Sequence, residues 1–262
     1  MNQAGPGQAW ADHDAGTSPR PARAARHRGL VIALTALGGV CCLVAAVLAG
    51  HAAIAQQTRR PTTAERAAAA ATAVARRWRT WPAGRIFPAT LGYSTRLLND
   101  DTARRVGISP QRQCAAALDP ALAGPARRAG CRAGLRASYV DELQGVVYTT
   151  GVLAFPNPAK ARAFDRGLPS ARPPVTALRA LAFPGTAAGR FADDSRQTAT
   201  ARQAGPYVLL TVAGYADGRT AAATGQYNST AFAAAGSLAK AILAPLNRPA
   251  VVDCAATRQW SC

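Results

Sequence analysis

One stretch of the sequence, residues 29–50, constrains the whole chain because its 22 residues carry no charge. A helix of that length is about 33 Å long, and the hydrocarbon core of a bilayer is about 30 Å thick. Four arginines lie just before the stretch, whereas the first arginine after it is Arg59. Because basic flanks stay on the cytoplasmic side, the sequence predicts a single-pass helix in the cell membrane, in contact with the lipid bilayer. The N-terminus is then cytoplasmic and the C-terminal domain extracytoplasmic.

A cleaved secretory signal is the main alternative, since Ala53-Ile54-Ala55 resembles a small-residue cleavage site. Signal cores are shorter, about 7–15 residues, and a 28-residue leader is long for a signal, so we favour a retained anchor. A buried core helix is a third interpretation. Cys41 and Cys42 lie in the middle of the stretch, where we interpret them as small apolar residues. The same domain is exported whether the stretch is a retained anchor or a cleaved signal.

The sequence predicts five parts from its changes in composition. The tail lacks enough apolar residues to fold, and Thr62 with Glu65 forms a capping box at the start of a helix that Trp81-Pro82 ends. We expect Trp78 and Trp81 to lie on one side of that helix and to pack on the domain. The parts are a disordered cytoplasmic tail (1–28), a transmembrane helix (29–50), a juxtamembrane linker and helix (51–81), an extracytoplasmic domain (82–248) and a cysteine-bearing tail (249–262).

Within the domain, apolar and β-branched runs separated by short turns predict two β-hairpins. The first pairs residues 134–143 with 146–155, and the second pairs 198–203 with 207–215. A helix follows each hairpin, so the expected fold class is α+β, with a mostly antiparallel sheet and helices packed on one face.

The remaining segments are less regular in pattern. We expect irregular structure at 82–108, a short helix at 109–118, a small-residue loop at 120–130 and a strand at 175–183. Toward the C-terminus, we expect a short strand between the Asp217-Gly218 turn and Gly225, and then a long helix capped by Asn228, Ser229 or Thr230.

Four cysteines follow the anchor: Cys114, Cys131, Cys254 and Cys262. An even number outside the cytoplasm favours disulfides. We prefer the pairs Cys114–Cys131 and Cys254–Cys262, because each joins nearby positions. The crossed pairings stay open, since spacing does not fix connectivity. A zinc site is disfavoured because no two of these cysteines have the C-x₂₋₄-C spacing.

Histidine is missing from the domain, since the three histidines are His13, His27 and His51. This excludes histidine-activated nucleophiles and histidine-ligated metal sites there. Phosphate-binding and dinucleotide-binding glycine patterns are also lacking. We therefore expect no catalytic residues, no metal and no cofactor.

Carboxylates are the remaining catalytic candidates. Asp141-Glu142 and Asp193-Asp194 are adjacent pairs, and glycoside hydrolysis uses two carboxylates. Neighbouring residues on a strand point to opposite faces, so neither pair makes a site alone. A site formed by Asp141 with Asp194 requires the fold to bring the two together; solvated turns are the favoured interpretation.

The formal net charge is +18, and 29 of the 31 basic residues are arginine. A strongly basic domain outside the membrane is attracted to anionic lipid head groups or envelope polymers. The favoured interpretation is nevertheless a solvated arginine surface without a ligand. The high arginine, alanine, glycine and proline content is typical of a high-GC bacterium. No zinc-finger spacing or basic helix repeat indicates nucleic-acid binding.

The arginine-flanked anchor and the outer cysteines give the chain a layout that resembles actinobacterial single-pass membrane proteins with a disulfide-bearing outer domain. The resemblance is one of architecture and implies no active site. The expected function is non-enzymatic binding or assembly in the cell envelope, with a membrane protein as partner. The alternatives are an arginine-rich binder of anionic envelope polymers or lipid head groups, and a carboxylate-dependent envelope hydrolase.

Overall fold

The computed structural model describes residues 22–58, 60–94, 101–169, 176–224 and 230–252 of the chain. The chain divides into two compact units. The first contains the N-terminal helix α1, and the second is Pro61–Asp253, which holds every described strand.

Helix α1 (Ala22–Thr58) has 37 residues and extends beyond 29–50 at both ends. Its stretch Leu30–Ala55 is the one helical segment, among the residues that the structure describes, that is long and apolar enough to cross a membrane. The side chains of this stretch are exposed throughout, so it is not a core helix. Length and composition fit a membrane span, and an N-terminal secretory signal has the same properties.

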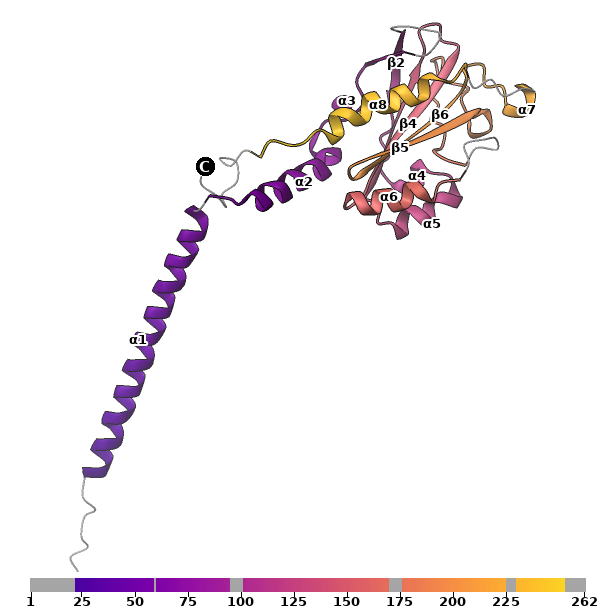
Figure 1. Cartoon of the computed structure of the whole chain (residues 1–262). Helices are drawn as coiled ribbons and strands as arrows, with labels where there is room; N and C mark the ends of the chain where they lie inside the picture. Colours follow the sequence, from indigo (N-terminus) through magenta and orange to yellow (C-terminus); the bar gives the residue numbers. More distant parts are fainter. Residues whose placement is uncertain (1–21, 59, 95–100, 170–175, 225–229, 253–262) are drawn as a thin grey trace, which may run out of the picture. The chain divides into compact units, whose positions relative to one another are not determined.

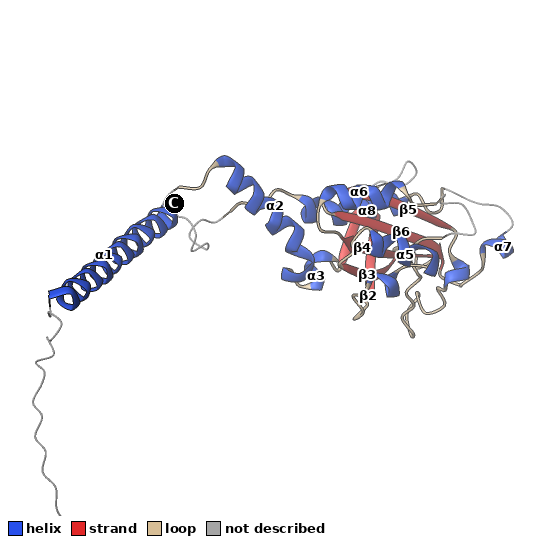
Figure 2. Cartoon of the chain, turned by 90° about the horizontal axis from the view of Figure 1, so that it is seen from below, coloured by secondary structure: helices blue, strands red, loops and turns tan. Residues whose placement is uncertain are grey.

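The second unit is built on a six-stranded sheet in the order β1-β2-β3-β4-β6-β5, and each neighbouring pair is antiparallel (Figures 1 and 2). The predicted α+β class with an antiparallel sheet is thus confirmed. So are the two hairpins, which are β3 with β4 and β5 with β6. The strands are β1 (Thr90–Tyr93), β2 (Asp101–Ile108), β3 (Ala133–Val140), β4 (Val146–Ala154), β5 (Thr198–Ala204) and β6 (Tyr207–Tyr215).

Both faces of the sheet are covered, and the expectation of helices on one face is wrong. Helix α8 (Ala234–Asn247) packs on one face with Tyr207 and Leu209, whereas the alternate residues Val208 and Leu210 belong to a second cluster. That second cluster includes residues of α4 (Cys114–Ala117), α5 (Pro120–Arg128) and α6 (Pro158–Arg166), which lie close together in Figure 1. The physical reason is that β6 is apolar at successive positions, so both of its faces need a cover.

Three segments before β3 differ from the expectation. Residues 82–108 contain α3 (Ala83–Ile86) and the strands β1 and β2 instead of irregular structure. The expected helix at 109–118 is limited to α4, and the expected loop at 120–130 is helix α5. Helix α5 forms because Pro120 suits the first position of a helix, while Leu122 and Ala126 are buried one turn apart.

The expected strand at 175–183 is wrong for its described residues, which form only one bridge, between Leu178 and Leu118. Side chains bind this backbone in place of a neighbouring strand. Arg136 donates to the carbonyl of Arg179, Ser138 donates to the carbonyl of Leu181, and Thr149 accepts from its amide.

The C-terminal elements are also partly different. The short strand expected before Gly225 is helix α7 (Ala221–Thr224). The long helix is present as α8, but it starts at Ala234, and the proposed caps Asn228 and Ser229 lie outside the described residues.

Cys114 and Cys131 form a disulfide, as preferred from the sequence, and it joins the start of α4 to the residue after Gly130. Cys254 and Cys262, the second pair preferred from the sequence, lie outside the described residues. Among the residues described, Cys41 and Cys42 of α1 are free.

Candidate functional site

Helix α2 (Thr63–Thr80) begins at the predicted capping box, in which the Thr62 hydroxyl accepts from the amide of Glu65 at 3.2 Å and the Thr62 amide donates to the Glu65 carboxylate at 2.9 Å. Its C-terminal half is the part that joins the domain. Val74 and Arg77 are its buried residues, and Trp78 packs against the cluster around α8. The expected packing of this helix on the domain is therefore confirmed.

Two polar contacts fix that half of α2. The Tyr207 hydroxyl donates to the Val74 carbonyl at 2.6 Å, and burial raises the pKa of Tyr207 to about 12. The Arg77 guanidinium donates to three carbonyls where α8 ends, those of Pro245, Leu246 and Arg248, at 3.1, 2.8 and 2.5 Å. These carbonyls lack partners within a helix, and the C-terminal end of a helix favours a cation. Burial lowers the pKa of Arg77.

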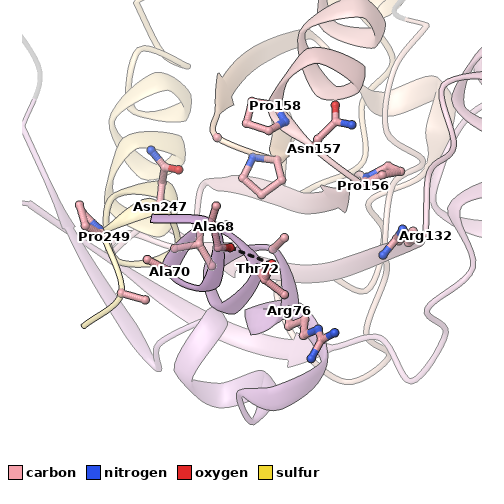
Figure 3. Close-up of a pocket in the computed structure, with 16 residues that line it drawn as sticks. Ala68, Ala70, Thr72, Arg76, Arg132, Pro156, Asn157, Pro158, Asn247 and Pro249 are labelled. Atoms are coloured by element: carbon pink, nitrogen blue, oxygen red, sulfur yellow. Dashed lines mark hydrogen bonds between the residues drawn. The ribbon is translucent and has the colours of Figure 1, made fainter. Parts of the chain in front are cut away.

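The N-terminal half of α2 leaves a cavity of about 680 Å³, which we call the α2 cavity (Figure 3). Its walls combine α2 with three loops and the end of α8. The alanines of α2 are too small to fill the space, so the gap stays open. The lining residues are Ala68, Ala70, Ala71, Thr72, Val74, Ala75, Arg76, Arg132, Pro156, Asn157, Pro158, Gly205, Pro206, Asn247, Pro249 and Ala250.

The β5–β6 turn forms part of the wall through Gly205, whose φ of +53° disfavours other residues. A side chain at this position would also meet Asn247, since an added Cβ would lie 2.0 Å from its Oδ1. Glycine therefore lets the turn and the end of α8 approach closely.

The cavity has a basic side. Arg76 and Arg132 are exposed, and neither guanidinium has an ion-pair or hydrogen-bond partner among the residues that the structure describes. Figure 3 draws both on the side of the cavity away from Asn247 and Pro249. The N-terminus of α6 lies here too, because Asn157 is its cap and accepts from the Lys160 amide at 3.0 Å. A helix N-terminus adds partial positive charge, and no described residue of the lining is acidic.

A second cavity of about 500 Å³ holds the groups most similar to catalytic ones. Its lining includes Tyr93, Asp101, Ser237 and Lys240, and the Tyr93 hydroxyl donates to the Asp101 carboxylate at 2.6 Å. Burial and that hydrogen bond raise the pKa of Tyr93 above its usual value. The described lining contains a single carboxylate, whereas glycoside hydrolysis uses a pair.

The carboxylates proposed from the sequence serve separate loops. Asp141 accepts from the Val146 amide at 2.8 Å and closes the β3–β4 turn. Asp193 accepts from the Ala180 amide at 2.7 Å, and Asp194 accepts from the neighbouring Ser195 hydroxyl at 3.4 Å. Asp141, Asp193 and Asp194 thus each have a structural partner in the described part of the chain, whereas Glu142 is exposed.

Sequence reasoning missed every residue of the α2 cavity as a candidate. The arginines that the fold uses and those that it leaves unpaired look alike in the sequence, and the lining alanines are typical of any strong helix. The sequence does contain the alanine run of α2 and three proline-containing segments that line the cavity. These segments are far apart in the sequence, and only the fold brings them together.

Comparison with protein-family models, with curated proteins and with solved structures gives no match for this chain.

Proposed function

We propose that this protein is a non-enzymatic binding protein of the cell envelope, anchored by residues 29–50 with its domain outside the cytoplasm, and that the α2 cavity is its binding site. The supporting observation is the cavity itself, whose volume lies within the roughly 300–1,000 Å³ of small-molecule sites and whose lining is mostly apolar with a few polar groups. The cavity lies on α2, the helix that follows α1, so the proposed site and the proposed anchor are close in the sequence.

Topology is tested by reporter fusions to the C-terminus. An enzyme active only outside the cytoplasm should be active, and one active only inside should be silent. The opposite pattern contradicts the location. Retention of residues 1–58 in the purified membrane protein, read by intact mass, separates an anchor from a cleaved signal.

The binding site is tested by filling it. We expect small molecules that co-purify with the full chain from its native membrane to be lost from Ala71→Trp, since Ala71 lines the cavity and has room for the larger side chain. Ala121→Trp on the exposed face of α5 is the matched control and should retain them. Identical small-molecule content in both variants contradicts the proposed site.

A binder of anionic envelope polymer is the second candidate, supported by the +18 charge and by exposed arginines such as Arg127, Arg128 and Arg202. Such binding should weaken steeply as salt rises, because surface charges are screened beyond about 10 Å at 0.1 M. Binding that is insensitive to salt excludes it.

A further inference from the structure

We propose, resting on the proposed function, that the α2 cavity takes a membrane phospholipid with an anionic head group, holding the phosphate at Arg76 and Arg132 and one apolar chain along α2. The inference comes from the asymmetry of the cavity, which is basic on one side and apolar along its length.

The head-group end is defined by positive charge without a partner. Two guanidinium groups and the N-terminus of α6 line the same cavity, and none of the lining residues that the structure describes supplies a carboxylate to neutralise them. Guanidinium groups bind phosphate through paired hydrogen bonds that are shorter and stronger than neutral ones. The buried arginines Arg77 and Arg196 are engaged by carbonyls or a carboxylate. Arg76 and Arg132 are exposed, as are Arg79 and Arg202, but they differ from these in lining the cavity.

The chain end is defined by shape and composition. From Ala68 to Arg76 the lining follows α2 for about 12 Å, at 1.5 Å per residue. Alanine, proline and glycine make up most of the opposite wall, so an apolar chain can lie there without leaving a polar group unsatisfied. Only four residues separate α1 from α2 in the sequence, and the bilayer around the proposed anchor contains molecules of this kind.

The test uses the full chain in phosphatidylcholine vesicles that contain a lysophosphatidic acid with a photoreactive group at the chain end. Crosslinked residues are mapped by mass spectrometry. We expect labelling at 68–75 and 249–250, about tenfold weaker in the double variant Arg76→Gln/Arg132→Gln, because the loss of charge-assisted hydrogen bonds to the phosphate costs at least one decade of affinity. Labelling of α1 by probe molecules in the surrounding bilayer is the internal reference and should not change.

The double variant Arg79→Gln/Arg202→Gln is the matched control, since it removes the same charge from exposed positions outside the cavity and should label as the wild type. The corresponding lysophosphatidylcholine probe should label the cavity weakly. Equal cavity labelling by both probes overturns the choice of an anionic head but leaves a binding cavity. Labelling confined to α1 overturns the lipid ligand, and the Ala71→Trp comparison then decides the proposed function independently.

Discussion

The two faces of the sheet are covered in different ways. On the α8 face, two long helices supply the cover, and apolar side chains such as Leu238 and Ile242 lie in a continuous cluster with four buried tyrosines of the sheet. On the opposite face, short helices and the described residues of the segment 176–196 form the cover, held by a disulfide and by buried polar contacts. A long helix buries enough apolar surface to stay in place, whereas an irregular segment must have its backbone groups satisfied by side chains.

Arginine illustrates the difference. Arg77 caps the carbonyls at the end of α8, and it adds to a contact that is already apolar. Arg196 is 8% exposed and joins Asp119 at 2.8 Å while it donates to the Leu178 carbonyl at 2.7 Å. It therefore ties three parts of the loop-covered face together. The comparison predicts that a single substitution lowers the free energy of unfolding more on this face than on the α8 face.

The largest expected effect is that of Arg196→Met. It leaves the buried carboxylate of Asp119 with the Ala177 amide but without a cation, and breaking a buried ion pair costs about 3–5 kcal/mol. Urea unfolding of the full chain measures it, with Arg202→Met on the exposed edge strand β5 as control. The double variant Asp119→Leu/Arg196→Met should be less destabilised than the sum of its single variants, since the pair acts as a unit. Strict additivity contradicts a coupled pair.

The disulfide comes next in size. Cys114→Ser/Cys131→Ser opens a link with a sequence separation of 17, and we expect a loss of about 3 kcal/mol in the free energy of unfolding from chain entropy. Hydrogen exchange should increase in α4 and α5 more than in α8. Cys41→Ser/Cys42→Ser in α1 is the control and should leave the domain unchanged. An equal increase in hydrogen exchange in α8 and in α4 and α5 would contradict the idea that the two faces are stabilised independently.

On the α8 face, Arg77→Met should cost about 2 kcal/mol, since hydrogen bonds to a charged donor contribute about 1.5–3 kcal/mol and the apolar contacts of Trp78 and Val74 remain. In the Arg77→Met variant, hydrogen exchange should be faster in α2 and little changed in β4. Arg79→Met, on the exposed side of the same helix, should have no measurable effect. A loss as large as that for Arg196→Met removes the distinction between the faces.

The sequence predicted the parts of this architecture that local pattern determines. The capping box at Thr62 and both hairpins are confirmed, because turn chemistry and alternation are local. The segment around Leu178 was mispredicted because side chains distant in sequence, such as Ser138, satisfy its backbone. The α2 cavity was not predictable for the same reason: Arg76 and Arg132 become neighbours of one cavity only through the fold.

The smallest expected effect concerns Tyr207, whose hydroxyl is buried under α2. Tyr207→Phe should cost about 1 kcal/mol, the net contribution of one hydrogen bond. Since burial raises the pKa of Tyr207 to about 12 from 10.0, its neutral form is favoured in the folded state, and the stability that it contributes is complete below pH 10 and falls as the pH rises toward 12. Urea unfolding between pH 9 and 12, about the range set by these pKa values, should show a steeper decline for the wild type than for Tyr207→Phe. Burial also raises the pKa values of Tyr139 and Tyr148 on this face, so the variant keeps a weaker alkaline dependence. Identical pH profiles would mean that the Tyr207 hydroxyl is not protected by the contact with α2.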